Sequence, residues 1–164
     1  MEDRPQGKLD PRIKAVWRIS DAIWITIVFL CVLAVGAIAW FADETTHDWS
    51  GLLCLVSLIV YAVALVVFMA GVTPLRYVRW HYALRPEFLE IEKGIIWRSH
   101  TVVPFIRVQN TDTQQGPILR LFGLASVMVS TAAGSMEIPG LASPEADAVR
   151  DRAAELARIA REDV

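Results

Sequence analysis

The chain has 164 residues, a mean hydropathy of +0.41 and six tryptophans, a composition typical of a membrane protein rather than a soluble one. Its formal net charge is only −2, which argues against the strongly basic surface that nucleic-acid binding requires. Two long apolar runs end at residue 72, and the roughly ninety residues beyond them are enough for one small domain and too few for two.

Residues 1–21 form a basic leader that is predicted to be cytoplasmic. Residues 1–8 are polar and are predicted to be disordered. A short helix should follow, because Asp10 is a good N-cap and Pro11 suits the first helical position. Two interpretations of this helix remain open. Either it lies on anionic lipid as an interfacial helix, or it is the cytosolic lead-in to the first span.

Two apolar runs, residues 22–41 and 52–72, dominate the chain. Each has about twenty residues without Asp, Glu, Lys, Arg or His, and at a rise of ~1.5 Å per residue it spans the ~30 Å core of a bilayer. The sequence therefore predicts a two-helix membrane hairpin over 22–72, joined by an acidic loop at 42–51. A signal peptide cleaved after residues 37–39 is the competing interpretation, but the apolar run is longer than a usual signal and continues past that point.

The charges around the spans predict their orientation. Basic residues precede the first span and follow the second, whereas loop 42–51 contains acids and no Lys or Arg. Because basic flanks resist translocation, both termini are predicted to be cytoplasmic and the loop to lie outside the inner membrane. The flanking basic residues are Arg4, Lys8, Arg12, Lys14, Arg18, Arg76, Arg79 and Arg85.

Few side chains inside the predicted spans are polar. Ser57 and Tyr61 lie one helical turn apart, so their hydroxyls should pair with each other or reach the first helix. The lack of charged residues removes the usual marker of an ion path. Cys31 and Cys54 have no neighbour at ligand spacing and are interpreted as packing residues. The Thr-Pro pair at 73–74 is predicted to end the second span.

Residues 73–164 are predicted to form a cytoplasmic, mainly β domain closed by a terminal helix. Alternating and β-branched residues predict short strands between about 78 and 139. Ser143 and Pro144 start a helix over about 143–162, with one apolar stripe suited to covering a sheet face or a barrel mouth. The predicted strands are 80–84, 88–93, 95–97 with 101–103, 106–113, 127–131 and 136–138, and the stripe is Val149, Ala153, Leu156 and Ala160.

Patterns that carry catalysis or metal binding are missing from the sequence. His47, His81 and His100 have no Cys or carboxylate at metal-ligand spacing, and Ser130 lacks a G-x-S-x-G context. There is also no glycine-rich phosphate loop. The prediction is therefore a protein that is not an enzyme, with no catalytic, cofactor-binding or metal-binding residues and no cofactor.

A basic surface is the first candidate binding site. Residues 75–164 contain eleven Lys or Arg and eleven Asp or Glu, a neutral balance that does not favour a specific phosphoinositide site. A modest patch facing anionic lipid remains a candidate, and a solvated strand face is its alternative. The candidate lipid-facing residues are Arg12, Lys14, Arg18, Arg98 and Arg107.

A partner surface is the second candidate, and the preferred one. Uncharged polar groups combined with aromatic and guanidinium groups are the composition that protein interfaces favour. The candidate residues are Trp97, Gln109, Gln114, Gln115 and Arg120. The alternative is that Trp97 belongs to the core and that Arg120 caps a connector. An open edge strand would also allow a peptide to join a sheet.

Six segments carry a family resemblance. They are Leu9-Asp10-Pro11-Arg12, Trp17-Arg18, Tyr77-x-x-Trp80-His81-Tyr82, Phe88-x-x-Ile91-x-x-Gly94-Ile95, Val103-Pro104-x-x-Arg107-Val108-Gln109, and Gln114 through Arg120-Leu121-Phe122-Gly123-Leu124. Together they resemble the bacterial pleckstrin-homology-like (PH-like) domain of small two-span membrane proteins. The resemblance implies a seven-stranded PH-like barrel or sandwich capped by a C-terminal helix, on the cytoplasmic face. It implies no enzymatic activity, and a larger membrane protein with several such domains as a partner.

The function predicted from these observations is a membrane-anchored PH-like interaction or scaffold module without catalysis, within a membrane or envelope-maintenance assembly. The alternative is a sensor of anionic lipid headgroups at the inner leaflet. The predicted partners are the lipid bilayer and a membrane protein, and a homo-oligomer is compatible with the sequence.

Overall fold

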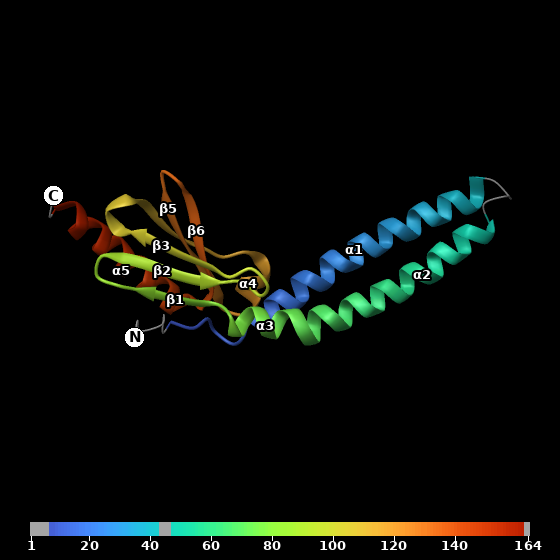
Figure 1. Cartoon of the computed structure of the whole chain (residues 1–164), viewed down its shortest axis with the longest axis horizontal. Helices are drawn as coiled ribbons and strands as arrows, with labels where there is room; N and C mark the ends of the chain where they lie inside the picture. Colours follow the sequence, from blue (N-terminus) through green and yellow to red (C-terminus); the bar gives the residue numbers. More distant parts are fainter. Residues whose placement is uncertain (1–6, 43–46, 163–164) are drawn as a thin grey trace. The chain divides into compact units, whose positions relative to one another are not determined.

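The computed structural model describes residues 7–42 and 47–162 (Figure 1). These residues form two compact units. One unit, called the domain below, contains residues 7–16 and 75–162, and the other, called the hairpin, contains residues 17–42 and 47–74. The residues that lead into the first span are therefore packed as part of the domain.

Long apolar helices make up the hairpin. They are α1 (Ile13–Ala42), whose first turn belongs to the domain, and α2 (His47–Val66), which continues through a π-helical turn, η2 (Val67–Val72), into α3 (Thr73–Val78). Two stretches, Ile13–Phe41 and Gly51–Val78, are long and apolar enough to cross a membrane, and almost none of their side chains is buried within the chain.

The second helix passes through Thr73 and Pro74, whereas the sequence predicts its end there. Pro74 has no N–H to donate, and its ring would crowd the carbonyl one turn earlier in a regular α-helix. The π-helical turn widens the backbone just before it. The Thr73 N–H and its hydroxyl both donate to the Phe68 carbonyl, the hydroxyl at 2.9 Å. This wider turn accommodates the proline without breaking the helix.

Small and hydroxyl-bearing side chains join α1 to α2. The Tyr61 hydroxyl shares a 3.2 Å hydrogen bond with Thr26 Oγ1, so it reaches the first helix, one of the two predicted arrangements. Ser57 instead donates to the Cys54 carbonyl at 2.8 Å. Gly36 is buried, and a Cβ added there would lie 3.0 Å from Cys54 Sγ. Close approach at small residues is how membrane helices gain packing contacts.

Two three-stranded antiparallel sheets form the body of the domain (Figure 1). The first sheet has the order β1-β2-β3 and the second has the order β4-β5-β6. The first sheet contains β1 (His81–Leu84), β2 (Phe88–Lys93) and β3 (Ser99–Pro104), and a 3-10 turn, η3 (Phe105–Arg107), follows it. The second contains β4 (Val108–Gln114), β5 (Leu124–Thr131) and β6 (Gly134–Ala142), with α4 (Pro117–Leu121) between β4 and β5 and α5 (Ser143–Glu162) after β6.

This architecture confirms the predicted β domain with a terminal helix but not the closed, seven-stranded form. The described residues contain six strands in two separate sheets. The predicted strand at residues 95–97 is a loop, because Gly94 adopts a φ of 119° and turns the chain before it. Residues 106 and 107 belong to η3 rather than to a strand. An apolar run alone does not distinguish a short strand from an exposed loop.

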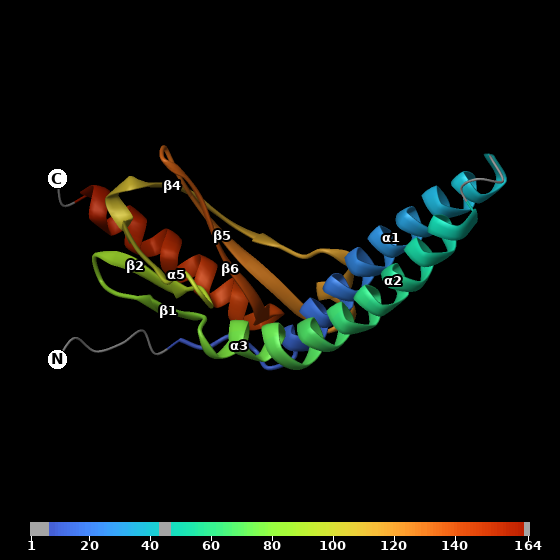
Figure 2. The ribbon, with the colours of Figure 1, turned by 45° about the vertical axis from the view of Figure 1, so that its right-hand side comes forward.

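The core lies between the sheets and α5. In β2, buried Leu89 and Ile91 alternate with half-buried glutamates, as the predicted period of two requires. Helix α5 packs on β4, β5 and β6 (Figure 2). Its buried residues are Ala146, Ala153, Leu156 and Ala157, and Val149 and Ala160 of the predicted stripe are half-buried. The terminal helix therefore covers one face of the second sheet, as predicted.

The leader is joined to the edge of the first sheet. Gly7 forms an antiparallel bridge with Tyr82, with N–H to carbonyl distances of 2.9 and 3.1 Å. The disorder predicted for residues 1–8 therefore does not extend to Gly7, and residues 1–6 lie outside the described residues. Leu9 is buried, and its carbonyl accepts a 3.0 Å hydrogen bond from the Tyr77 hydroxyl. Backbone pairing orders this short polar segment, although its composition favours disorder.

The start of α1 is fixed by Asp10. Its Oδ1 accepts the Arg12 N–H at 2.8 Å, the N-cap bond that the sequence predicts, and its own N–H donates to the Gly140 carbonyl at 3.0 Å. Ile13 is 1% exposed and packs on Gly140, which has a φ of 63° and has no room for a Cβ beside Ile13. From there α1 runs unbroken into the first apolar run, as expected if the leader helix is the lead-in to that span.

Candidate functional site

The β4–α4 corner of the domain, residues 114–122, brings together part of the predicted partner surface. Gln114 and Arg120 are both exposed here. Leu121, the residue after Arg120, is a large apolar side chain that is 83% exposed. Pro117 at the start of α4 suits the first helical turn, and Gly123, with a φ of 63°, ends the segment before β5. The α4 corner therefore presents an amide, a guanidinium and an apolar anchor on one short segment.

Two side chains hold the α4 corner in place from outside the helix. Gln115 Nε2 donates to the Leu124 carbonyl at 2.8 Å and to Ser143 Oγ at 3.1 Å. Arg12 Nη1 donates to the Phe122 carbonyl at 3.0 Å. Gln115, predicted as a partner residue, is therefore used within the fold, and the leader fixes the end of α4. Because these hydrogen bonds already fix the α4 corner, it should lose little conformational entropy when a partner binds.

The other predicted partner residues lie elsewhere in the domain. Gln109 is exposed on β4, at the opposite end of that strand from Gln114. Trp97 is 87% exposed in the β2–β3 loop, residues 94–98, so it does not belong to the core. The neighbouring Ile96 is 85% exposed. The predicted set thus divides into the α4 corner, the β2–β3 loop and a strand position.

Two leader residues of the predicted basic patch are engaged within the domain. The Arg12 guanidinium forms a bidentate pair with Asp10, at 2.8 and 3.0 Å, in addition to its bond to the Phe122 carbonyl. This pair lowers the pKa of the Asp10 carboxyl below its usual range, chiefly through the hydrogen bond. Lys14 is half-buried, with Nζ 4.6 Å from the centroid of the Tyr77 ring. Arg12 and Lys14 therefore hold the leader in the fold.

The three remaining basic residues do not form one patch with them. Arg98 and Arg107 are exposed, but Arg98 comes just before β3 and Arg107 ends η3 just after it. A six-residue strand, roughly 20 Å long, separates their backbones. Arg18 belongs to the hairpin, where it lines a shallow apolar groove with Ile19 and Met69. A headgroup site made by convergent arginines is not assembled within the domain.

Among the residues that the structure describes, no group of three or more His, Cys, Asp or Glu could hold a metal ion. Tyr82 in β1 is a buried titratable group whose pKa is strongly raised. Burial disfavours its phenolate, and the nearby Glu145 carboxylate adds repulsion, so its pKa is raised to about 12. The Tyr82 hydroxyl is 3.5 Å from Glu145 Oε1. This contact joins β1 to the first turn of α5 and has a structural role.

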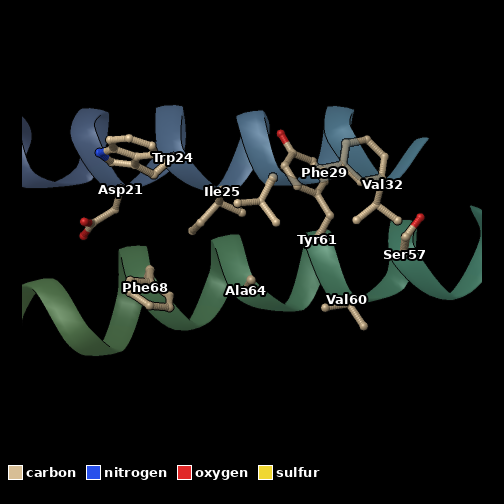
Figure 3. Close-up of a pocket in the computed structure, with 11 residues that line it drawn as sticks. Asp21, Trp24, Ile25, Phe29, Val32, Ser57, Val60, Tyr61, Ala64 and Phe68 are labelled. Atoms are coloured by element: carbon tan, nitrogen blue, oxygen red, sulfur yellow. The ribbon is translucent and has the colours of Figure 1, made fainter. Parts of the chain in front are cut away.

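A second apolar groove of the hairpin lies between α1 and α2. It has a volume of ≈ 370 Å³, is lined almost wholly by apolar side chains, and has Asp21 at one end and Ser57 at the other (Figure 3). Phe29 and Tyr61 stack inside it with ring centroids 4.4 Å apart. The sequence analysis missed this groove because Asp21 precedes the apolar run and was grouped with the leader. The only hint of the groove in the sequence was Asp21, a single carboxylate next to the first apolar run.

These observations define a class of protein, a small β domain with a terminal helix that is anchored by a two-helix apolar hairpin. A family model for the bacterial PH domain matches residues 13–157. The chain is 32% identical over 164 residues to the UPF0699 transmembrane protein YdbS of Bacillus subtilis (strain 168), covering 100% of both chains. No solved structure matches it. The chain belongs to the bacterial PH domain family, as the resemblance of its segments predicts.

Proposed function

We propose that this protein is a membrane-anchored, non-catalytic interaction module that holds a protein partner at the membrane through its α4 corner. Leu121 is the observation that carries the proposal, because a large apolar side chain is 83% exposed on a segment fixed by Gln115 and Arg12. Arg120 precedes it directly, and Gln114 is exposed on the same short segment. An apolar anchor beside an arginine, presented by a rigid segment, is typical of the residues that dominate binding energy in protein interfaces.

The proposed setting is the inner membrane, with both termini in the cytoplasm. The basic flanks of the spans and the acidic loop between them support this orientation. The proposed partner is a membrane protein, for which the resemblance suggests a larger chain with several PH-like domains, in a membrane or envelope-maintenance assembly. Being anchored beside its partner raises the effective concentration of the α4 corner, so a small surface is sufficient.

A sensor of anionic headgroups is less well supported. Such a site needs several cations that converge on one phosphate. Arg12 is paired with Asp10 and bonded to a backbone carbonyl, and Lys14 lies over an aromatic ring. Arg98 and Arg107 lie at opposite ends of β3. These positions favour protein recognition over a headgroup pocket.

Site-specific photo-crosslinking in the native host tests the proposal. A photoreactive residue at position 121 should form an adduct with a membrane protein, and the same residue at Ala133, exposed in the turn between β5 and β6, should not. The Arg120→Ala change should reduce the adduct from position 121 several-fold, because it removes the flanking guanidinium. Equal adducts from positions 121 and 133, or none from 121, would exclude the α4 corner as the partner surface.

A further inference from the structure

The β2–β3 loop makes a tight turn at Gly94. Gly94 has a φ of 119°, and a Cβ at this position would collide with the Trp97 carbonyl. The chain therefore folds tightly back on itself between β2 and β3. Ile96 and Trp97 are left 85% and 87% exposed at the turn. The loop presents two adjacent large apolar side chains in a defined conformation.

These exposures match those of residues that face lipid. In the hairpin, Phe41 is 87% exposed and Ile38 is 70% exposed. Among the described large apolar side chains of the domain, only Leu121 is comparable to Ile96 and Trp97. A soluble surface normally covers such groups, and two adjacent ones mark a binding surface. Ile96 and Trp97 are thus exposed to the same degree as side chains in a bilayer.

Charge identifies the surface that the loop fits. Residues 93–100 include Lys93, Arg98 and His100 and no acidic residue, whereas the domain as a whole is neutral. The nearest acid along the chain, Glu92, is half-buried and lies opposite His100 in the β2–β3 pairing. An apolar tip with cations on both sides complements an anionic bilayer surface, because tryptophan favours the interface and Lys or Arg is attracted to anionic headgroups.

We propose that the β2–β3 loop is a second membrane contact of this protein, in which Ile96 and Trp97 enter the interface of an anionic bilayer beside Lys93 and Arg98. Only Arg79 and Trp80 separate α3 from β1, so the domain stays close to the membrane that holds its spans. Tethering makes a contact effective that would be weak in a free domain. This contact is distinct from the α4 corner and does not depend on its proposed partner.

A single fluorescent label reports the contact in the full chain. Cys31 and Cys54 are replaced by alanine, and an environment-sensitive dye is attached to a cysteine at Ile96→Cys or, as the matched control, at Leu121→Cys. The protein is reconstituted in vesicles of phosphatidylcholine with or without phosphatidylglycerol. In the anionic vesicles, the dye at position 96 should be quenched by brominated lipid and several-fold less by aqueous iodide than the dye at position 121. The K93Q/R98Q double change should reverse this protection.

Two results would overturn the proposal. The first is equal iodide quenching at positions 96 and 121 in anionic vesicles. The second is protection of position 96 only in native membranes and never in pure lipid, which would assign the loop to a protein partner. Circular dichroism confirms that each labelled variant is folded, as expected for changes at exposed positions. Neither result bears on the crosslink from position 121, so failure here and failure of the α4 corner are distinguishable.

Discussion

The same residue type has opposite environments in the two units. Ile13, in the part of α1 that belongs to the domain, is 1% exposed, whereas Ile59 in α2 is 56% exposed. The domain is stabilised by removing apolar side chains from water. Side chains of the hairpin find an apolar environment in lipid, so its two helices are joined by a few close contacts at Gly36, Tyr61 and Thr26. Hydrophobicity alone therefore does not indicate which residues hold the chain together.

Of the changes considered, Gly140→Ala should destabilise the domain most and leave the hairpin unaffected. The change places a Cβ in contact with the Ile13 side chain at a φ of 63°, and backbone strain plus overpacking should cost on the order of 4 kcal/mol. The control is Gly71→Ala in the hairpin, where no atom lies within 4 Å of an added Cβ and little should change. Hydrogen exchange of the reconstituted protein, read peptide by peptide, should show the domain losing protection while the hairpin keeps it. If Gly140→Ala and Gly71→Ala changed hydrogen exchange equally, close packing at Gly140 would not be what stabilises the domain.

Ile13→Ala tests the same contact by removing volume. Truncating this buried side chain should destabilise the domain by about 3 kcal/mol, whereas Ile59→Ala on the lipid-facing surface should have little effect. Urea denaturation of the domain measures the difference. In the Ile13→Ala background, Gly140→Ala should cost less than in the original chain, because the contacts with Ile13 Cγ1 and Cδ1 are removed and only the one with Cβ remains. Additive effects would show that the two residues do not interact.

Tyr82 makes the stability of the domain sensitive to high pH. Its pKa is raised to about 12 in the folded state, against about 10 when unfolded. The resulting stabilisation is therefore complete below pH 10 and is lost as the pH rises to 12, a loss of about 2–3 kcal/mol. Denaturation of the original chain and of Tyr82→Phe at pH 9 and pH 12 isolates this contribution. Parallel losses in both proteins would refute it.

Asp10→Ala should have the smallest effect of the four changes. It removes the N-cap of α1 and the partner of Arg12, at a cost of about 1 kcal/mol. Because the pKa of Asp10 is lowered in the folded state, the stabilisation is present above the unfolded value near 4 and is lost as the pH falls through the folded value. The difference between the two proteins should therefore shrink in acid. The control is Asp151→Ala, which removes the exposed ion pair between Asp151 and Arg150 on α5 and should change the stability little.

Part of the candidate site was within reach of sequence analysis. Arg120 and Gln114 are predicted partner residues because interfaces favour uncharged polar and guanidinium groups, and the structure leaves both exposed; their role stays a prediction. Gln115 has the same character, but it donates to Leu124 and Ser143 inside the fold. Trp97 occurs in an apolar run that predicts a strand, and only the turn at Gly94 exposes it. Whether a polar or aromatic side chain faces inward depends on partners that a local pattern does not reveal.

Local sequence patterns were enough to predict the two long apolar helices, the N-cap at Asp10, the alternation of β2 and the terminal helix, because each depends on residues that are close together along the chain. The tertiary structure decided that the leader belongs to the domain. Gly7 and Ile13 meet Tyr82 and Gly140, residues far away along the chain. It also decided that Pro74 continues a helix, through the wider turn before it. Burial is a property of surfaces brought together from distant segments, which is why no single stretch of sequence specifies it.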